Sequence, residues 1–479
     1  MADESTILSV GIDIGTSTTQ VVFGRLTFKN SAGYFSVPHV AISDKKVIYK
    51  SDIYRTPLID RIRIDGEKIR HIVAAEFDKA GFTPEDTQTG AVIITGESAR
   101  KENSEIVLQN LSDFAGEFVV STAGPDLEAI IAGKGSGARQ YSIEHQCRVI
   151  NLDIGGGTTN AVCFDCGEVI GKGCLDIGGH LIQFDSNGTV TYVSDSADKI
   201  GASEGIFLKA GDPADYTLIY RIASQMAGLL HEWIGQRESR LIQTITTPGS
   251  SEFNIKSSGC RLCFSGGVAD GIYHPSKKNW MSYGDMGILL GEAIRESRLF
   301  SDYQVIEAKE TIRATVVGAG SYTTSVSGST ISYNRDVFPL KNIPVLKLDE
   351  EEQELCFKGE AEKLKEKLQW MQEQSDSNQL ILAMKGKNNP SYVQILNLAR
   401  CLTEVLDEVL DKHQPMIIVL EHDMAKALGQ MMQRMVPEQS RDIICIDSIQ
   451  VDQNDFVDMG KPLVDGLVIP VVVKTLIFG

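Results

Sequence analysis

The sequence predicts an α/β protein with several domains, and three observations support this prediction. The chain has 479 residues, which is too long for one hydrophobic core, because domains usually hold about 50–200 residues. A Gly- and Thr-rich pattern, Ile12–Gln20, returns 140 residues later as Leu152–Asn160. Beyond residue 380, apolar runs alternate with helical patterns, which is typical of a small parallel α/β region.

The composition excludes several classes of protein. Lys and Arg number 46 against 64 Asp and Glu, so the net charge is −18, which disfavours broad contact with nucleic-acid phosphates or anionic lipid. The acidic start, Met1–Thr6, lacks the basic and apolar regions of a secretion signal. The apolar run Leu463–Phe478 is interrupted by Asp465, Pro470 and Lys474, so we expect no membrane span. These features predict a cytoplasmic protein without nucleic-acid or membrane partners.

The nine cysteines do not form the pattern of a secreted disulfide framework. The two C-x-x-C pairs, Cys163/Cys166 and Cys260/Cys263, are too far apart for the usual spacing of a zinc site. We interpret them as reduced cysteines of the core and of turns.

The two copies of the repeated pattern predict β-hairpins. Each copy lies between two short apolar runs, residues 7–10 and 21–23 for the first and 148–150 and 161–164 for the second. The order strand, Gly/Thr-rich turn, strand is that of a hairpin. Between the hairpins, the sequence predicts strands at 91–95 and 118–121 and helices at 98–114 and 126–132, the last ended by the glycines of 133–137.

After the second hairpin, the sequence predicts mainly helices, followed by a parallel sheet near the C-terminal end. The spacing of apolar residues predicts helices at 214–234 and 288–294, and 261–264 predicts a strand. The charged stretch 349–374 predicts one solvated helix. The closing β-α-β-α-β series is expected at 380–384, 391–412, 416–420, 423–435 and 442–446, followed by a strand at 468–478.

The two hairpins have the chemistry of a phosphate clasp. Glycines let backbone N–H groups approach an anion, and hydroxyls add hydrogen-bond donors. The leading Asp13 and Asp153 repel phosphate, so their natural partner is Mg²⁺, held directly or through its waters. Two such hairpins facing each other would grip a polyphosphate from both sides. The residues expected to bind phosphate are Gly15, Thr16, Ser17, Thr18 and Thr19 in the first hairpin and Gly155, Gly156, Gly157, Thr158 and Thr159 in the second.

Other nucleotide-binding motifs are incomplete. The chain contains no Gly-x-x-x-x-Gly-Lys-[Ser/Thr] sequence, so a P-loop is excluded. Gly318-Ala319-Gly320 follows the apolar run Thr315–Val317, but the third glycine of a dinucleotide turn is missing. We expect a structural turn there, or a loop near a nucleotide.

The set of motifs resembles that of the actin-like ATPase superfamily, in the same order along the chain. Phosphate-1 corresponds to Asp13–Gln20, phosphate-2 to Asp153–Asn160, the first connecting helix to Gly124–Gly133, the adenosine turn to Leu262–Gly267, and the second connecting helix to Asp285–Ala293. This resemblance implies an actin-like (ribonuclease H-like) two-domain ATPase with a C-terminal α/β extension. It implies ATP between two domains that hinge at the connecting helices.

The resemblance also implies site residues and domain bounds. Asp13 and Asp153 would hold Mg²⁺ and serve catalysis, and Asp126 and Glu128 lie where the superfamily often places a group that orients the attacking water. His180 fits either a nucleotide-facing loop or an ordinary surface histidine. The domains are expected at 1–148, 149–300 and 301–479. Further nucleotide contacts are expected from Gly178, Gly179, Ser265, Gly266 and Gly267.

Within that superfamily, the chain resembles the ethanolamine ammonia-lyase reactivating factors over its full length. The matching stretches are Leu8–Gln20, Cys263–Gly271, Ala314–Ser321 and Val468–Leu476. The resemblance implies a bacterial cytoplasmic protein, associated with the ethanolamine microcompartment, that uses ATP and Mg²⁺ to help ethanolamine ammonia-lyase exchange damaged cobalamin for intact adenosylcobalamin. The chain has no Asp-x-His-x-x-Gly motif, so cobalamin would belong to the partner enzyme.

Two alternatives share the same fold. A small-molecule kinase needs a carboxylate base beside the acceptor hydroxyl, and Asp126, Asp176 and Asp185 are candidates that no motif marks. A cytoskeletal filament-forming ATPase needs a self-complementary surface, and the sequence alone does not identify such a surface. The segment 468–478 has the pattern of a strand rather than of an amphipathic membrane helix, which disfavours the filament-forming ATPase.

Overall fold

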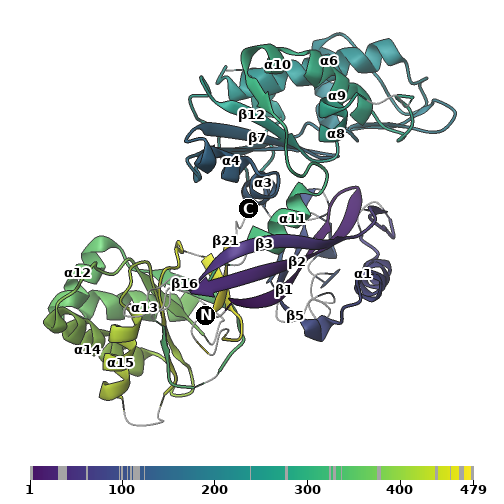
Figure 1. Ribbon diagram of the computed structural model, residues 1–479. Helices are drawn as coiled ribbons and strands as arrows, with labels where there is room; N and C mark the ends of the chain where they lie inside the picture. The colour runs from purple at the N-terminus through teal and green to yellow at the C-terminus, as the bar shows by residue number, and fades with distance from the viewer. Residues whose placement is uncertain are drawn as a thin grey trace.

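The computed structural model arranges the chain in three lobes (Figure 1). The first is built around the first hairpin, the second around the second hairpin, and the third from residues beyond 325. Among the residues described, no helix has both the length and the apolar character needed to cross a membrane. The structure describes residues 4–30, 40–60, 63–96, 98, 101–104, 106–107, 111, 119–122, 124–237, 239–275, 279–322, 325–326, 331–335, 337–374, 379–436, 441–453, 455–462, 466 and 469–475.

The first lobe is a mixed sheet with a helix on its outer face. Its elements are β1 (Glu4–Ile14), β2 (Thr18–Asn30), β3 (Val40–Lys50), β4 (Tyr54–Arg55), β5 (Thr87–Ile94), β6 (Val119–Thr122), α1 (Gly66–Ala80) and the 3₁₀ turn Pro84–Asp86. The strand order is β3-β2-β1-β5-β6, with β1, β2 and β3 antiparallel and β5 and β6 parallel to β1. Val10 and Ile12 of β1 share a core with Phe77 of α1. The Asp65 carboxylate caps the start of α1, and Gly81 ends it with a φ of 74°.

The second lobe repeats this strand order as β9-β8-β7-β12-β13. Its elements are α4 (Ala138–Glu144), β7 (Arg148–Ile154), β8 (Thr159–Asp165), β9 (Glu168–Leu175), β10 (Ile182–Phe184), β11 (Val190–Val193), α5 (Asp195–Ser203), α6 (Tyr216–Ile234), α7 (Arg240–Thr244), β12 (Arg261–Ser265), α8 (Ala269–Tyr273), α9 (Gly287–Glu296), α10 (Arg298–Asp302) and β13 (Gln304–Ile306). β7, β8 and β9 are antiparallel, whereas β12 and β13 run parallel to β7 and to each other. Met226 of α6 and Leu290 of α9 share a core with Leu152 of β7. Two lobes with this topology form the duplicated ribonuclease H-like architecture of the actin-like fold, so the expected fold class is confirmed.

Two helices pack against each other between these lobes (Figure 1). α3 (Pro125–Gly135) lies on the sheet of the second lobe, and α11 (Ala314–Tyr322) lies on that of the first. Glycines make the close approach possible. A Cβ atom at Gly135 would lie 1.8 Å from the Ala314 carbonyl oxygen, and one at Gly318 would lie 2.1 Å from that of Ile131. On the other side of α11, a Cβ at Gly11 of β1 would lie 2.5 Å from the Val316 carbonyl oxygen.

Two predictions about the connecting helices are corrected. The helix expected at 126–132 continues to Gly135, so Gly133 lies inside α3 and the helix ends within the glycine stretch 133–137 rather than before it, because packing without side chains favours glycine there. The segment expected as the second connecting helix, 285–293, is α9, which packs on α6 and α8 inside the second lobe. The connecting position belongs to α11, where Gly318-Ala319-Gly320 was expected to form a turn or a loop. Contacts with α3 and β1 outweigh this local preference.

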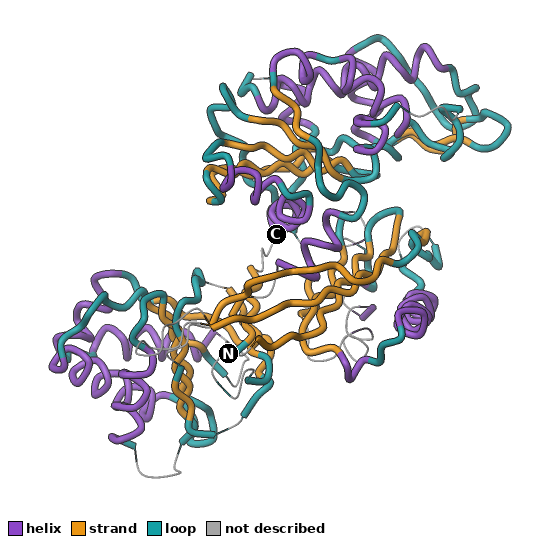
Figure 2. The backbone as a smooth tube through the Cα atoms, viewed as in Figure 1, coloured by secondary structure: helices purple, strands orange, loops and turns teal. Residues whose placement is uncertain are grey.

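The third lobe contains the expected parallel sheet. Its elements are β14 (Ser325–Val326), β15 (Ser332–Tyr333), β16 (Leu340–Lys347), α12 (Glu350–Lys358), α13 (Glu362–Gln374), β17 (Ile381–Met384), α14 (Tyr392–Val409), β18 (Met416–Leu420), α15 (Ala425–Met435), β19 (Ile443–Ile446), β20 (Asp455–Met459) and β21 (Pro470–Thr475). The strand order is β14-β21-β20-β16-β17-β18-β19-β15, with β16 to β19 parallel. The helices gather on one side of these strands (Figure 2).

Residues 349–374 form two helices rather than the single solvated one expected. Gly359, with a φ of 85°, ends α12, because glycine accepts the left-handed conformation that closes a helix. Phe357, Leu364 and Leu368 are buried against α14 and its neighbours, so one face belongs to the core. The helix expected at 98–114 falls largely outside the described residues.

The cysteines agree with their interpretation as reduced residues. All nine are free. Cys163 and Cys260, one from each C-x-x-C pair, are buried in the core of the second lobe, and Cys166 is exposed in the turn after β8.

Replacing Gly318 by Ala should destabilise the protein, because the added methyl group meets the backbone of α3. Overpacking of this kind costs about 1–3 kcal/mol, so the midpoint of thermal unfolding should fall by several degrees. Gly228→Ala in α6 is the matched control, because a Cβ there would have no heavy atom within 4 Å and Ala favours a helix. An equal effect of the two substitutions, measured by differential scanning calorimetry, would contradict the close packing of α3 on α11.

Candidate functional site

The two hairpin turns have the same geometry and lie next to each other. The Gly15 amide donates to the Thr18 carbonyl at 2.8 Å, and the Gly155 amide donates to the Thr158 carbonyl at 2.9 Å. A Cβ atom at Gly156 would lie 2.6 Å from the Ser17 hydroxyl oxygen. The two turns therefore meet across the boundary between the first and second lobes.

Three buried carboxyl groups gather beside these turns: Asp13 from β1, Asp153 from β7 and Glu128 from α3. Burial raises the pKa of Asp13 to about 7, with a hydrogen bond from Thr95 opposing the shift and the charge of Asp153 adding to it. Burial also raises the pKa of Asp153 to about 6. The pKa of Glu128 rises to about 8, through burial and then through the charges of Asp153 and Asp13. The three groups thus form one electrostatically coupled site.

The duplicated fold supplies each aspartate with the same kind of support. The Thr95 hydroxyl, at the end of β5, donates to Asp13 Oδ1 at 3.0 Å. The Ser265 hydroxyl, at the end of β12, donates to Asp153 Oδ1 at 2.5 Å. β5 and β12 are the parallel neighbours of β1 and β7. Ser265 is the register partner of Asp153, whereas Thr95 lies two residues beyond Ile93, the register partner of Asp13, so the two lobes supply similar hydroxyls from positions that differ by two residues. The expected nucleotide residue Ser265 thus contacts Asp153.

Two amide oxygens beside the carboxyl groups lack hydrogen-bond donors. Gln20 is paired with Asp13 across the first hairpin, and Asn160 is paired with Asp153 across the second. Gln20 Oε1 and Asn160 Oδ1 are buried and find no donor within the described parts of the chain. Unpaired buried acceptors are costly, and amide and carboxylate oxygens are ligands that hard cations prefer.

These oxygens fit Mg²⁺ held partly through water. Three coupled carboxyl groups with raised pKa values and two unpaired amide oxygens form an oxygen-rich site that a cation would stabilise. Within the described ranges, no group of three or more His, Cys, Asp or Glu is close enough to hold a metal directly. Mg²⁺ normally keeps several of its waters and takes one or two carboxylates, which agrees with this spacing.

Asp126 and Glu128 lie on the same helix but have different surroundings. Glu128 accepts a hydrogen bond from the Gly96 amide at 3.2 Å and lies with the two aspartates. Asp126 accepts hydrogen bonds from the amide and hydroxyl of Ser251 and pairs with Lys172 Nζ at 3.2 Å. Asp126 therefore fastens α3 to the second lobe, and Glu128 is the acidic residue of α3 that faces the site.

The expected phosphate-binding hydroxyls divide into two groups. Thr19 bonds Thr56 Oγ1 at 3.1 Å, and Thr159 donates to the Ile177 carbonyl at 2.8 Å. Both are buried and support the turns from inside. The other hydroxyl-bearing residues of the turns lie nearer the surface: Thr16, Ser17 and Thr18 are partly exposed, and Thr158 is 9% exposed.

The remaining predicted glycines shape the backbone around the second hairpin. A Cβ at Gly178 would lie 2.3 Å from the Gly156 carbonyl oxygen, and the Gly179 amide donates to the Gly155 carbonyl at 2.9 Å. Gly266 has a φ of 88°, and a Cβ there would lie 2.3 Å from the Ile154 carbonyl oxygen. Gly267, next to it, has only one side-chain atom within 4 Å of its Cβ position.

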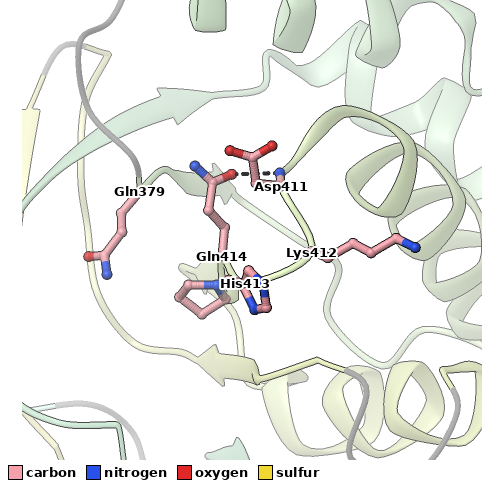
Figure 3. Close-up of a pocket in the computed structure, with 6 residues that line it drawn as sticks. Gln379, Asp411, Lys412, His413 and Gln414 are labelled. Carbon is pink, nitrogen blue, oxygen red and sulfur yellow. Dashed lines mark hydrogen bonds between the residues drawn. The ribbon is translucent and has the colours of Figure 1, made fainter.

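A cavity of about 520 Å³ lies elsewhere, in the third lobe (Figure 3). It opens where β17 and β18 begin, and its lining residues are Gln379, Asp411, Lys412, His413, Gln414 and Pro415. The charged side chains among them are exposed. Ligands of parallel sheets bind at the opposite, carboxyl ends of the strands, so this cavity is not the candidate site.

Sequence reasoning missed the supporting residues. Thr95 ends the strand expected at 91–95, and Asn160 is the last residue of the second hairpin motif, but no role was predicted for either side chain. A polar residue that ends an apolar strand, such as Thr95 after Ala91–Ile94, is the signal that could have found one of them. The pairing of Gln20 and Asn160 with the two aspartates follows from hairpin register, which requires the strand ends to be known.

The family of the chain is shown by comparison with known proteins. The sequence model described as "Ethanolamine utilisation protein EutA" matches residues 5–479. The ethanolamine ammonia-lyase reactivase EutA of Salmonella typhimurium is 34% identical over 474 residues, and that of Escherichia coli is 33% identical over 475, each covering 98% of both chains. The solved Ppx/GppA family member of Aquifex aeolicus is 14% identical with a TM-score of 0.40, covering 66% of this chain and 97% of that one. The chain therefore belongs to the EutA family of ethanolamine utilisation proteins.

Proposed function

We propose that this protein is an ATP-dependent reactivating factor for ethanolamine ammonia-lyase. In this role it promotes the release of damaged cobalamin from the lyase and its exchange for intact adenosylcobalamin. The observation that carries the proposal is the end-to-end similarity to two ethanolamine ammonia-lyase reactivases, which covers 98% of both chains. That alignment includes the third lobe, which lies outside the duplicated ATPase core.

The paired hairpins are the proposed site for ATP and Mg²⁺. Asp13 and Asp153 would hold Mg²⁺ directly or through its waters, with Gln20 Oε1 and Asn160 Oδ1 as the nearby acceptors that lack donors among the described residues. When bound, Mg²⁺ neutralises negative charge on phosphate oxygens. The backbone amides and exposed hydroxyls of the turns would grip the phosphates.

Glu128 is the proposed residue that orients the attacking water. Its carboxylate lies on the side of α3 that faces Asp13 and Asp153, and burial, followed by these two charges, raises its pKa. A carboxyl group with a pKa near 8 is matched to proton transfer near neutral pH. Asp126 is unsuited to this role, because Ser251 and Lys172 already occupy its oxygens.

The two connecting helices are the proposed route from nucleotide to lyase. α3 carries both Glu128 and Gly135, which contacts α11, so a movement at the nucleotide would displace the helix pair and with it the lobes. We propose that the domains correspond to 1–148, 149–300 and 301–479, with α3, α4 and β13 packed on the second and α11 packed on the first, and that the third supplies specificity for the lyase. Cobalamin stays on the lyase, and the site of action is the bacterial cytoplasm or its ethanolamine microcompartment.

Removing any of the three site carboxylates should abolish Mg²⁺-dependent ATP hydrolysis. Asp13→Asn, Asp153→Asn and Glu128→Gln should each lower kcat by about a thousandfold, about 4 kcal/mol of transition-state stabilisation. Asp126→Asn is the matched control on α3: it removes a carboxylate that does not face the site, so the loss of its pairing with Lys172 should lower turnover far less than the other three substitutions. A steady-state phosphate-release assay measures all four, and wild-type rates in the first three variants would contradict the site.

The stability of the metal-free protein should fall as pH rises from about 5 to about 9. The folded pKa values of about 7, 6 and 8 exceed the ordinary values of Asp and Glu, so the folded state binds more protons in this range and the free energy of unfolding declines with pH. Thermal unfolding in EDTA should show the decline, and Mg²⁺ should restore stability at high pH. Glu128→Gln should flatten the profile, whereas Glu85→Gln on an exposed turn should not. A profile unchanged by Glu128→Gln would refute the coupling.

The affinity for cobalamin-inactivated ethanolamine ammonia-lyase should depend on the bound nucleotide. A nucleotide shifts this affinity only through its preference for one of two conformations, and typical couplings of 1–3 kcal/mol give about 5- to 150-fold. Calorimetric titration with ATP analogue, with ADP and without nucleotide measures the effect, and linkage requires the lyase to change nucleotide affinity by the same factor. Equal lyase affinity in the three states would contradict the proposal, and phosphate transfer to a sugar or acetate would favour a kinase instead.

A further inference from the structure

A chain of hydrogen bonds joins the first lobe to the second at the hairpin turns. The Ser17 hydroxyl bonds His180 Nδ1 at 2.5 Å, and His180 Nε2 pairs with Asp285 Oδ2 at 2.8 Å. Ser17 belongs to the first turn, whereas His180 and Asp285 belong to the second lobe. We call these three residues the Ser-His-Asp chain.

Each residue of the Ser-His-Asp chain is held in place by hydrogen bonds within its own lobe. The Thr56 amide donates to the Ser17 carbonyl at 3.0 Å, and the His180 amide donates to the Gly156 carbonyl at 2.7 Å. Asp285 is 5% exposed, and its second oxygen accepts a hydrogen bond from the Gly287 amide at 2.7 Å, at the start of α9. The imidazole is therefore held on both sides, and Ser17 is the member that the first lobe contributes.

The Ser-His-Asp chain lies between the two turns proposed to bind phosphate. A Cβ at Gly156 would be 2.6 Å from Ser17 Oγ and 3.1 Å from His180 Nδ1. The hydroxyl of the first turn, the backbone of the second and the imidazole thus converge on one point. Ser17 has one hydroxyl hydrogen, so it cannot donate to His180 and to a phosphate oxygen at the same time.

We propose that His180 is the residue by which the protein distinguishes nucleoside triphosphate from diphosphate. The proposal rests on the proposed binding of ATP at the hairpins. The terminal phosphate accepts the Ser17 hydroxyl hydrogen bond in place of His180 Nδ1. The imidazole, still held at Nε2 by Asp285, takes up a proton from solvent at Nδ1 and donates this N–H to a second phosphate oxygen. A diphosphate does not reach this point and leaves the Ser-His-Asp chain intact. The terminal phosphate then links the first turn, through His180 and Asp285, to α9 in the second lobe.

The test is the ratio of affinities for a non-hydrolysable ATP analogue and for ADP, measured by isothermal titration calorimetry. His180→Phe keeps a planar ring but removes both ring nitrogens, so it should weaken binding of the analogue by at least about fivefold relative to ADP. His180→Gln retains an amide that can bond on one side and should recover part of the ratio. Asp285→Asn, which loses the charge that orients the imidazole, should lower the ratio in the same direction.

His231 provides the matched control. It also pairs with an aspartate, His231 Nε2 to Asp302 Oδ2 at 2.9 Å, but within α6 and α10 of the second lobe. His231→Gln should therefore leave the ratio of the two affinities unchanged even if it lowers stability. An unchanged ratio in His180→Phe and Asp285→Asn, in proteins that still bind ADP, overturns the role of His180 and leaves the proposed function standing. Failure of the wild-type protein to bind either nucleotide overturns both.

Discussion

The close packing of α3 on α11 is the constraint on which the rest of the structure depends. Gly135 and Gly318 bring the two backbones together at a distance that no side chain allows, and each helix lies on the sheet of a different lobe. α3 also carries Glu128 to the hairpins. The geometry of the carboxylate site therefore depends on a contact that contains no functional residue, and small residues there preserve both this contact and the site.

Duplication explains the symmetry of the site. Each lobe places an aspartate at the end of its first strand, a hydroxyl at the end of the parallel neighbour and an amide across the hairpin. The two lobes differ in the residues that each adds to this plan. The second lobe adds His180 and Asp285, whereas the first receives Glu128 through α3. A symmetric pair of turns and an asymmetric set of added residues thus arise from one repeated plan.

The site is electrostatically unfavourable without a cation. Three buried carboxyl groups with raised pKa values and two amide oxygens without donors among the described residues are tolerated at this point of the chain, although burial of such groups normally destabilises a fold. Asp126, two residues from Glu128 on the same helix, is instead paired with Ser251 and Lys172. The contrast agrees with the proposed role of the unfavourable groups in binding Mg²⁺ and nucleotide, while the pairing of Asp126 holds α3 in place.

The sequence by itself determined the two hairpins, the fold class and the parallel region of the third lobe, because strand periodicity and Gly/Thr-rich turns are local properties. It also identified Asp13 and Asp153, since both lie in the repeated motif. Tertiary structure decided what depends on contacts between distant segments. It made Thr315–Gly320 a connecting helix through glycine packing on α3, separated Glu128 from Asp126 by giving them different neighbours, and joined Ser17 to His180 across two lobes. No local pattern encodes these contacts, because each partner lies far away in the sequence or on another face of the same helix.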